Sequence, residues 1–236
     1  MFFYIIRHGR PDYATDTLLP DGIEQAKLAA KRLSSVPIDA IYASPMGRAQ
    51  ETAQALSEVT GLPVQTEDWA YELCDESRTT FPDGEKKLLS TVKPQILQSA
   101  EVRLLPPDAA FTQIDAYVQS GFPDRYKSIA QGLDDLLARN GYSRTDDGFY
   151  HADAPNDRHI CLFCHGGMLR VLLSHMLNIP VQLLSATLMV QFTGITVLYF
   201  RTETESVCPM LVSVGDTGHL YYDGVPQKHY CSQKEY

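Results

Sequence analysis

Phe2-Phe3-Tyr4-Ile5-Ile6-Arg7-His8-Gly9 opens the chain with an apolar run that ends in arginine, histidine and glycine. The apolar part predicts a short buried strand. A second apolar run, residues 159–164, ends in His165-Gly166-Gly167. In an open α/β sheet, ligands bind beyond the carboxyl ends of the strands. The two histidines are therefore predicted to meet at one edge of a sheet, where the glycine after each lets a ligand approach the backbone.

A third motif follows another short apolar stretch, residues 40–43. The chain continues through Ser44-Pro45-Met46-Gly47 into Arg48-Ala49-Gln50-Glu51-Thr52-Ala53, which has the composition of a helix. Arg48 is therefore predicted near a helix N-terminus, where free N–H groups and the positive end of the helix dipole favour an anion. Two arginines and two histidines at such a place indicate a phosphate site.

These three motifs, in this order and spacing, resemble the histidine phosphatase superfamily, which is also called phosphoglycerate mutase-like. The resemblance rests on Arg7-His8-Gly9, on Ser44-Pro45-x-x-Arg48-Ala49-x-Glu51-Thr52-Ala53, and on Cys164-His165-Gly166-Gly167-Met168-Leu169-Arg170. It spans roughly residues 1–200. Each motif alone is weak, whereas the ordered set is specific.

The resemblance implies a role for each motif. His8 would be the catalytic nucleophile, which attacks phosphorus and forms a phosphohistidine that water then hydrolyses. Arg7, Arg48, His165 and Gly166 would bind the phosphoryl oxygens, and His165 would also act in catalysis. Guanidinium groups suit this task because each meets two oxygens at once and stays charged at every working pH. The expected chemistry needs neither a metal nor another cofactor.

A leaving alkoxide also needs a proton, so a carboxylic acid is expected to face the phosphate. In many family members this acid is a glutamate just after the third strand, which corresponds to Glu72 after the predicted strand 62–66. Further candidates are Asp75, Glu76 and Glu85. The phytase-like branch instead carries aspartate directly after its second histidine, where this chain has Gly166. Because the histidine must be unprotonated and the acid protonated, activity is expected to peak on the acidic side of neutrality.

The chain departs from the family pattern after Gly9. Many members continue Arg-His-Gly-x-Thr-x-x-Asn, whereas Pro11 and Ala14 occupy the threonine and asparagine positions here. Two usual polar contacts near the phosphate are missing, which favours hydrolysis of small phosphomonoesters over mutase activity. Arg10 and Tyr13 are predicted to contact the leaving group instead. The alternatives are a phosphoglycerate-type mutase, a protein phosphohistidine phosphatase, and a phosphate-binding protein without turnover.

Length and composition agree with an enzyme that acts on a small phosphorylated metabolite. The chain has 236 residues, 44% of them hydrophobic, which is enough for a large core in a single domain over residues 1–236. The formal net charge of −9 argues against nucleic-acid or anionic-membrane binding. Scattered cysteines, no recognisable signal peptide and no long apolar span predict a cytoplasmic protein.

The stretch Cys161-Leu162-Phe163-Cys164-His165 also matches the attachment pattern of c-type haem. Haem attachment usually requires export, for which the N-terminus has no signal. A zinc or redox site would need a second pair of cysteines, which the sequence lacks. The two cysteines alternate with apolar residues, as in a buried strand. A structural role in the strand is therefore the preferred interpretation.

Helical and strand patterns alternate along the chain. Helices are predicted over residues 21–33, 46–60, 124–139 and 168–177, and strands over 2–6, 40–43, 62–66, 159–164, 187–200 and 209–214, with a bulge or turn as an option at Gly194. Residues 215–220 are interpreted as a turn that enters a strand. The alternation predicts an α/β fold, a three-layer α/β/α sandwich whose mostly parallel sheet carries helices on both faces. Residues 74–122 break the rhythm and predict a cap-like insertion that shapes substrate choice, or a surface excursion without function.

Overall fold

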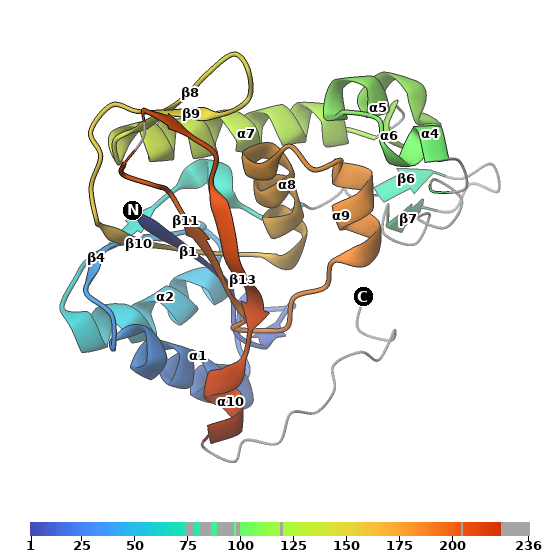
Figure 1. The fold of residues 1–236 in the computed structure, drawn as a ribbon. Coiled ribbons are helices and arrows are strands. Elements are labelled where there is room, and N and C mark those ends of the chain that lie inside the picture. The colour runs from blue at the N-terminus through green and yellow to red at the C-terminus, as the bar shows by residue number, and fades with distance from the viewer. Residues whose placement is uncertain are drawn as a thin grey trace.

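The computed structural model describes residues 1–73, 78–80, 86–88, 97, 100–118, 120–203 and 205–222. A central sheet has the strand order β13-β11-β1-β10-β4-β5 (Figure 1). Its strands are β1 (Phe2–Arg7), β4 (Ile38–Ala43), β5 (Val64–Thr66), β10 (His159–Cys164), β11 (Ile195–Tyr199) and β13 (Met210–Asp216). β1, β10, β4 and β5 are parallel, and β11 runs antiparallel to both of its neighbours. The predicted mostly parallel sheet is confirmed.

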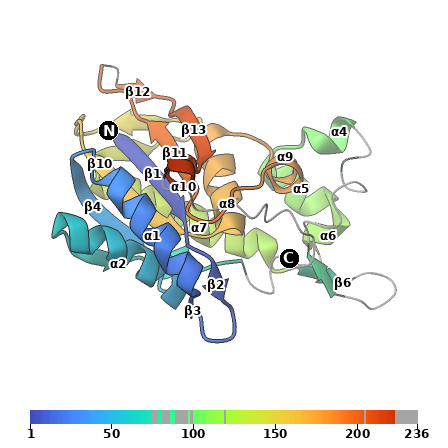
Figure 2. The same cartoon turned by 90° about the horizontal axis from the view of Figure 1, so that it is seen from below.

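Helices cover both faces of this sheet, as Figures 1 and 2 show. α1 (Pro20–Leu33) and α2 (Gly47–Thr60) lie on one face, and α7 (Phe122–Arg139) and α8 (Gly166–Leu177) lie on the other. Successive side chains of a strand point to opposite faces. In β1, Tyr4 and Ile6 accordingly pack with the α1 and α2 side, whereas Phe3 and Ile5 pack with α7 and α8. The three-layer α/β/α sandwich is confirmed.

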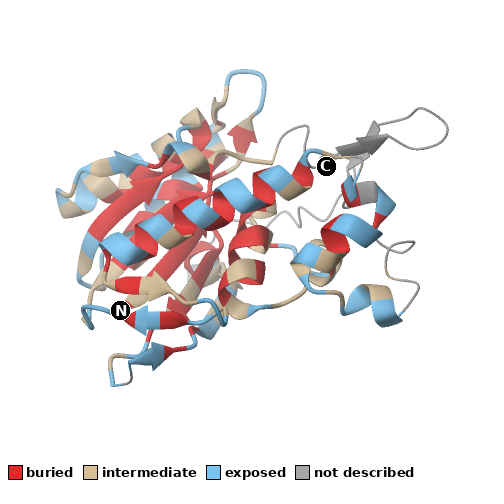
Figure 3. Cartoon of the chain, turned by 90° about the horizontal axis from the view of Figure 1, so that it is seen from above, coloured by how far each residue is buried: buried red, intermediate tan, exposed pale blue. Residues whose placement is uncertain are grey.

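Local sequence explains where these helices begin and end. α1 begins at Pro20, whose fixed φ suits the first helical position. α2 ends at Thr60, and the following Gly61 has a φ of 75°, the left-handed cap conformation that glycine accepts most easily. α7 presents a buried face to the sheet and an exposed face to solvent (Figure 3), which is the amphipathic pattern that its sequence predicts.

The remaining elements are short. They are β2 (Pro11–Asp12), β3 (Thr17–Leu18), the 3₁₀ helix η1 (Asp68–Ala70), β6 (Arg78–Thr80), β7 (Lys86–Leu88), α4 (Ala100–Arg103), α5 (Pro107–Gln113), α6 (Asp115–Val118), β8 (Tyr142–Arg144), β9 (Tyr150–Ala152), α9 (Val181–Thr187), β12 (Ser206–Val207) and α10 (Gly218–Tyr222). β2 and β3 form a hairpin directly after the Arg7-His8-Gly9 motif. No helix among the described residues is long and apolar enough to span a bilayer.

The described part of the predicted insertion 74–122 contains the hairpin β6–β7 and the helices α4, α5 and α6, which Figure 1 shows beside α9. Phe111 and Tyr117 of these helices are buried in the same core as α7. The Gln182 side chain in α9 donates to the carbonyl of Leu105 at 2.8 Å. These helices therefore pack on the body of the fold, while the single-domain boundary and the cap role stay predictions.

One predicted strand is shorter than expected, and one predicted element is wrong. Of the predicted strand 187–200, only β11 is strand, because Thr193 has a φ of 55° and its N–H bonds to the Arg7 carbonyl at 3.0 Å. The second is the interpretation of residues 215–220 as a turn entering a strand. Helix α10 begins there instead, after the Asp216 carboxylate accepts the N–H of Gly218 at 2.8 Å. Both errors arise from contacts that local sequence patterns do not encode.

The cysteines of the haem-like pattern lie in β10, on opposite faces of the sheet. Cys161 packs with the α1 and α2 side, and Cys164 packs with the α7 and α8 side. Burial raises the pKa of both thiols. Since the two sulfur atoms face different layers, they do not form one attachment site.

Candidate active site

The strand ends bring the two predicted histidines together. In the parallel pair β1–β10, Arg7 lies opposite Cys164, and the His8 N–H donates to the Cys164 carbonyl at 2.9 Å. The rings of His8 and His165 are 5.2 Å apart between centroids. On the other side of β10, the Ser44 N–H donates to the Phe163 carbonyl at 2.9 Å. The carboxyl ends of β1, β10 and β4 thus meet at one place.

The hydrogen bonds of His8 define which ring nitrogen is open for chemistry. Nδ1 lies 2.7 Å from the carbonyl oxygen of Gly9, and since a carbonyl only accepts, Nδ1 carries the proton. Nε2 therefore bears the lone pair, and it accepts the Nε–H of Arg48 at 3.3 Å. His8 is 1% exposed. Burial and the charges of Arg7 and Arg48 hold its pKa well below the usual value, although the bond to Gly9 opposes them, so the ring is neutral at neutral pH.

Arg48 lies in the first turn of α2 and is buried. Its Nη1 forms an ion pair with Asp16, which lies in the turn of the β2–β3 hairpin. The other Asp16 oxygen accepts the N–H of Gly47 at 2.7 Å. Asp16 therefore orients Arg48 from the hairpin. The sequence analysis did not identify Asp16, because an acidic residue in a short turn carries no distinctive signal.

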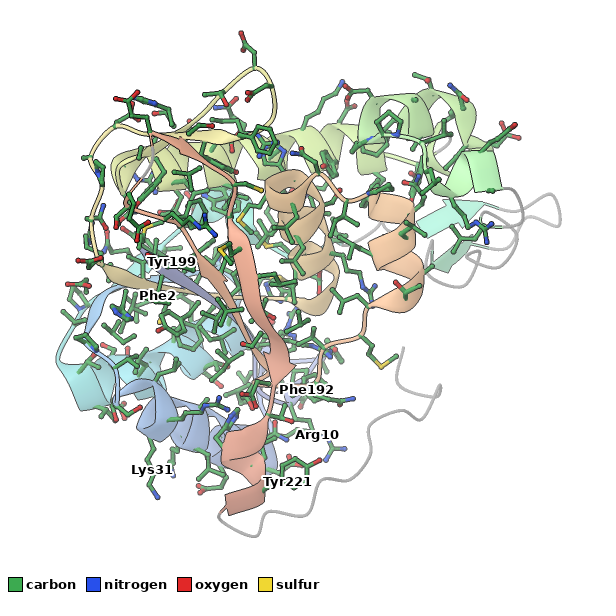
Figure 4. The ribbon with its side chains drawn as sticks, in the orientation of Figure 1. Phe2, Arg10, Lys31, Phe192, Tyr199 and Tyr221 are labelled. Atoms are coloured by element: carbon green, nitrogen blue, oxygen red, sulfur yellow. The ribbon has the colours of Figure 1, made fainter. Side chains whose placement is uncertain are left out.

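Arg7 is held by the irregular segment between α9 and β11. Its Nη1 donates to the Val190 carbonyl at 2.7 Å, and its guanidinium lies 4.1 Å from the centroid of the Phe192 ring. The Phe192 ring is also 5.6 Å from the His8 ring. Figure 4 shows Phe192 near Arg10, at the end of the sheet opposite Phe2 and Tyr199. Phe192 was missed because its segment was predicted to be a strand.

His165 is fully buried and has one ring nitrogen occupied. Its Nε2 lies 2.7 Å from Ser44 Oγ, whereas Nδ1 has no hydrogen-bond partner among the residues that the structure describes. Burial, followed by the charges of His8, Arg48 and Arg7, lowers its pKa well below the usual value. A buried polar atom without a partner is rare, and at a site of this kind it is available to a ligand.

Two glycines allow close packing at the N-terminus of α8. A Cβ on Gly166 would lie 3.3 Å from Arg7 Nε, and a Cβ on Gly167 would lie 2.8 Å from Glu72 Oε1. The same Glu72 oxygen accepts the N–H of Leu73 at 2.9 Å and that of Met168 at 3.2 Å. The carboxylate of Glu72 thus lies over the first turn of the helix that begins after His165.

Thr52 connects two of the motifs directly. Its hydroxyl accepts the N–H of Gly9 at 3.0 Å and donates to the carbonyl of Arg48 at 2.7 Å. Nearby, Glu51 accepts the N–H of Leu18 at 2.7 Å, which attaches the β2–β3 hairpin to α2. The threonine and glutamate of the second motif therefore serve to position the loop that follows His8.

The other predicted site residues are placed less directly. Arg10 forms an ion pair with Asp21 at 2.8 Å. Tyr13 is 59% exposed, and its ring centroid lies 5.5 Å from the Arg48 guanidinium. The further acid candidates Asp75, Glu76 and Glu85 lie outside the described residues. Among those that are described, no three His, Cys, Asp or Glu side chains are grouped as they would be to hold a metal ion.

The lowered histidine pKa values predict that stability depends on pH. Besides His8 and His165, His219 bonds through Nε2 to the Thr193 hydroxyl at 3.0 Å, and burial followed by the charge of Arg32 lowers its pKa to about 4. Below about pH 6.5 the unfolded chain binds protons that the folded chain does not. The free energy of unfolding should therefore fall as the pH decreases from about 6.5 towards 4, by up to about 1.4 kcal/mol per pH unit for each group.

Urea unfolding between pH 7.5 and pH 4.5 measures this dependence. His219→Gln keeps a polar partner for Thr193 without a titratable ring, so this variant should lose less stability on acidification than the wild type. Equal pH dependence in both proteins would show that His219 does not contribute.

Comparison with known proteins bears on the first third of the chain and on the fold. Residues 3–74 match the family model described as histidine phosphatase superfamily (branch 1), which confirms the resemblance for this segment. Comparison with curated protein sequences finds no match.

Solved structures of similar fold include several phosphatases. A mutant phosphoserine phosphatase from Entamoeba histolytica in complex with phosphoserine has 22% identity and a TM-score of 0.61, over 93% of this chain and 98% of that one. A mycobacterial glucosyl-3-phosphoglycerate phosphatase in complex with VO3 has 21% identity and a TM-score of 0.56, over 90% and 97%. An α-ribazole phosphatase from Shigella flexneri has 18% identity and a TM-score of 0.58, over 92% and 97%. At these identities, the likeness establishes the fold.

Proposed function

Because residues 3–74 match the family model of the histidine phosphatase superfamily (branch 1) and the chain has the fold of solved phosphatases, we propose that this protein hydrolyses small phosphomonoesters through a phosphohistidine at His8, without a metal ion. The observation that carries the proposal is the state of His8. Its ring is neutral, its proton is on Nδ1, and its Nε2 lone pair faces Arg48. A neutral imidazole whose unprotonated nitrogen lies beside a buried guanidinium is suited to attack a bound phosphate.

Fixed positive charge supports binding of the phosphoryl group. Arg7 and Arg48 are both buried, so their charges are poorly screened by water. The Ser44 hydroxyl is hydrogen-bonded to Nε2 of His165. With its proton on Nδ1, the His165 ring donates from Nδ1 to a phosphoryl oxygen. The N–H of Gly166, at the start of α8, is proposed as a further donor. These donors are held in place before the substrate arrives, which favours the transition state.

The proposed reaction has two steps. In the first, Nε2 of His8 attacks phosphorus, the bond from phosphorus to the leaving oxygen breaks, and the carboxylic acid of Glu72 gives that oxygen a proton. The bond from Nδ1–H to the Gly9 carbonyl stabilises the cationic ring that results. In the second, the Glu72 carboxylate takes a proton from water as the water oxygen attacks phosphorus. The P–N bond then breaks, which releases inorganic phosphate and restores neutral His8.

The solved relatives suggest the first substrates to test. Their names include phosphoserine and glucosyl-3-phosphoglycerate, and one structure contains 3-phosphoglyceric acid. These compounds are small phosphomonoesters, the class that we propose for this protein. The proposed location is the cytoplasm, where such metabolites occur.

Phosphate release in the presence of a chelator tests the proposal. The panel contains phosphoserine, 3-phosphoglycerate, glucosyl-3-phosphoglycerate, α-ribazole phosphate and p-nitrophenyl phosphate. We expect release of phosphate from at least one member, with unchanged rate when the chelator is added. Binding of substrates without any turnover would indicate a phosphate-binding protein. Transfer of the phosphoryl group to a second hydroxyl, without free phosphate, would indicate a mutase.

Arg10 and Tyr13 are proposed to influence the choice of leaving group. The hairpin that carries Tyr13 also carries Asp16, which forms an ion pair with Arg48. A substitution on this hairpin therefore lies close to the proposed phosphate site. Tyr13→Ala should change the ratios of kcat/KM among the panel members by roughly 5-fold or more, an effect on the scale of one lost aromatic contact. Arg10→Ala should have a smaller effect, because its guanidinium is already paired with Asp21.

Steady-state kinetics on the whole panel measures these ratios. Phe149→Ala removes an exposed aromatic ring from the turn between β8 and β9 and serves as the control. If both hairpin variants retained the substrate ranking of the wild type, the role of the hairpin in specificity would be wrong.

A further inference from the structure

Arg125 is a buried cation that the proposed mechanism does not use. It lies in the first turn of α7 and is 3% exposed. Its Nη2 donates to the carbonyl of Trp69 at 2.8 Å and to that of Tyr71 at 2.6 Å. Its guanidinium also lies 3.5 Å from the centroid of the Tyr71 ring. Burial of a charge is costly, so such a residue needs several strong contacts of this kind.

These contacts belong to the segment that leads from β5 to Glu72. The segment is docked on α7 at three places. Glu67 forms an ion pair with Arg139, and Trp69 packs so closely on α7 that a Cβ on Gly132 would lie 2.2 Å from its ring. Arg125 makes the third attachment, at the residue directly before Glu72. Among these three, it is the one nearest to the proposed proton donor.

The far end of the same segment reaches the phosphate site. The Glu72 carboxylate lies over Gly167 and accepts the N–H of Met168, within the first turn of α8. Arg125 is also among the charges that lower the pKa of His165, which places it near the site electrostatically. A continuous series of contacts therefore links α7, through Arg125 and the Tyr71 carbonyl, to Glu72.

We propose that Arg125 is a positioning residue of the active site. By binding the carbonyls of Trp69 and Tyr71 at once, it holds the backbone before Glu72 and keeps the carboxyl group over the phosphate site. The inference rests on the proposed function, in which Glu72 gives a proton to the leaving oxygen. One planar, charged donor is well suited to hold two carbonyls, and a neutral side chain of similar length cannot replace it.

Two substrates distinguish positioning of the acid from a general effect on the fold. A serine alkoxide leaves slowly without a proton, whereas p-nitrophenolate is a stable anion that leaves without one. We expect Arg125→Met to lower kcat/KM for phosphoserine, or for the best alkyl monoester of the panel, by about 100-fold, the lower end of what a positioned general acid contributes. This ratio reports only the steps up to formation of the phosphohistidine, so the role of Glu72 as a base in the second step does not enter it. For p-nitrophenyl phosphate, kcat/KM should fall by less than about 3-fold. The Kd for inorganic phosphate should change little, because Arg7, Arg48 and His165 still bind the phosphate.

A double-mutant cycle connects this effect to Glu72. Glu72→Gln should show the same selective loss on the alkyl substrate, and the double variant should be no slower than the slower single variant. Arg125→Lys keeps the charge but presents a point donor instead of a fork, so it should show a smaller loss with the same selectivity. This variant also keeps the test valid if Arg125→Met does not fold.

Lys127→Ala is the matched control. It removes a cation from an exposed position of the same helix, two residues from Arg125. Because this side chain is exposed, both substrates should be hydrolysed within about 2-fold of the wild-type rate.

Two results would overturn the inference while the proposed function stands. One is an equal loss of kcat/KM for both substrates in the Arg125 variants, which would show a general structural role. The other is multiplication of the Arg125 and Glu72 effects in the double variant, which would show that the two residues act independently. By contrast, a wild-type protein that releases phosphate from no member of the panel would refute the proposed function itself.

Discussion

Replacement of His8 by alanine is expected to reduce phosphate release by at least about 10⁴-fold on every substrate that the protein hydrolyses, since losses of this order follow removal of a catalytic nucleophile. The structure offers a specific reason. His8 places its unprotonated Nε2 beside Arg48. Among the described residues, the only other imidazole in contact with the His8 ring is that of His165, and its Nε2 is hydrogen-bonded to Ser44. His165 is therefore not placed to act as the nucleophile instead. Steady-state phosphate release, with the substrate that ranks first in the panel, measures the loss.

A trapping experiment shows whether the covalent intermediate forms on this residue. Acid-labile, alkali-stable phosphate should accumulate on the wild-type protein after rapid quenching with labelled substrate, and it should be absent from His8→Ala. His151→Ala removes a half-exposed histidine from β9 and should behave as the wild type. Retention of a hundredth or more of the wild-type rate by His8→Ala would exclude His8 as the nucleophile.

Replacement of Arg48 by alanine should have the second largest effect, a decrease in kcat/KM of about 10³-fold, as is found when a charged donor to a transferring phosphoryl group is removed. Arg48 acts on both reacting partners. Its Nε–H bonds to His8 Nε2, and its charge helps to keep that ring neutral. In the variant, the Asp16 carboxylate also loses its cationic partner and remains beside the phosphate as an uncompensated negative charge. The lost positive charge and the uncompensated carboxylate both disfavour binding of a dianionic substrate.

Measurement of kcat and KM separately gives more information than the rate alone. Arg48→Lys retains the charge but not the Nε–H that contacts His8, so it should recover substrate binding more than it recovers kcat. Arg201→Ala, at an exposed position after β11, is the control and should not differ from the wild type. A decrease of less than 10-fold for Arg48→Ala would show that Arg48 does not bind the phosphoryl group.

Local patterns were sufficient for most of the sheet and its helices. The apolar runs at residues 2–6 and 159–164 became β1 and β10, and the helical pattern of residues 21–33 became α1. These segments are governed by burial, which appears in the sequence as runs and periodicity. The segment between α9 and β11 was mistaken for strand because its shape depends on hydrogen bonds to β1, such as that from Thr193 to Arg7. Its local composition does not record such a contact.

By itself, the sequence determined the fold class and the meeting of Arg7, His8, Arg48 and His165, because each of these residues follows an apolar run whose carboxyl end has a defined place in an α/β sheet. Only the tertiary structure decided how they are held. Asp16 orients Arg48, Ser44 occupies one nitrogen of His165, Phe192 covers Arg7, and Arg125 fixes the segment before Glu72. These partners come from turns, loops and a distant helix. Hydrogen bonds and ion pairs between such elements depend on three-dimensional distance, and residue spacing along the chain does not encode that distance.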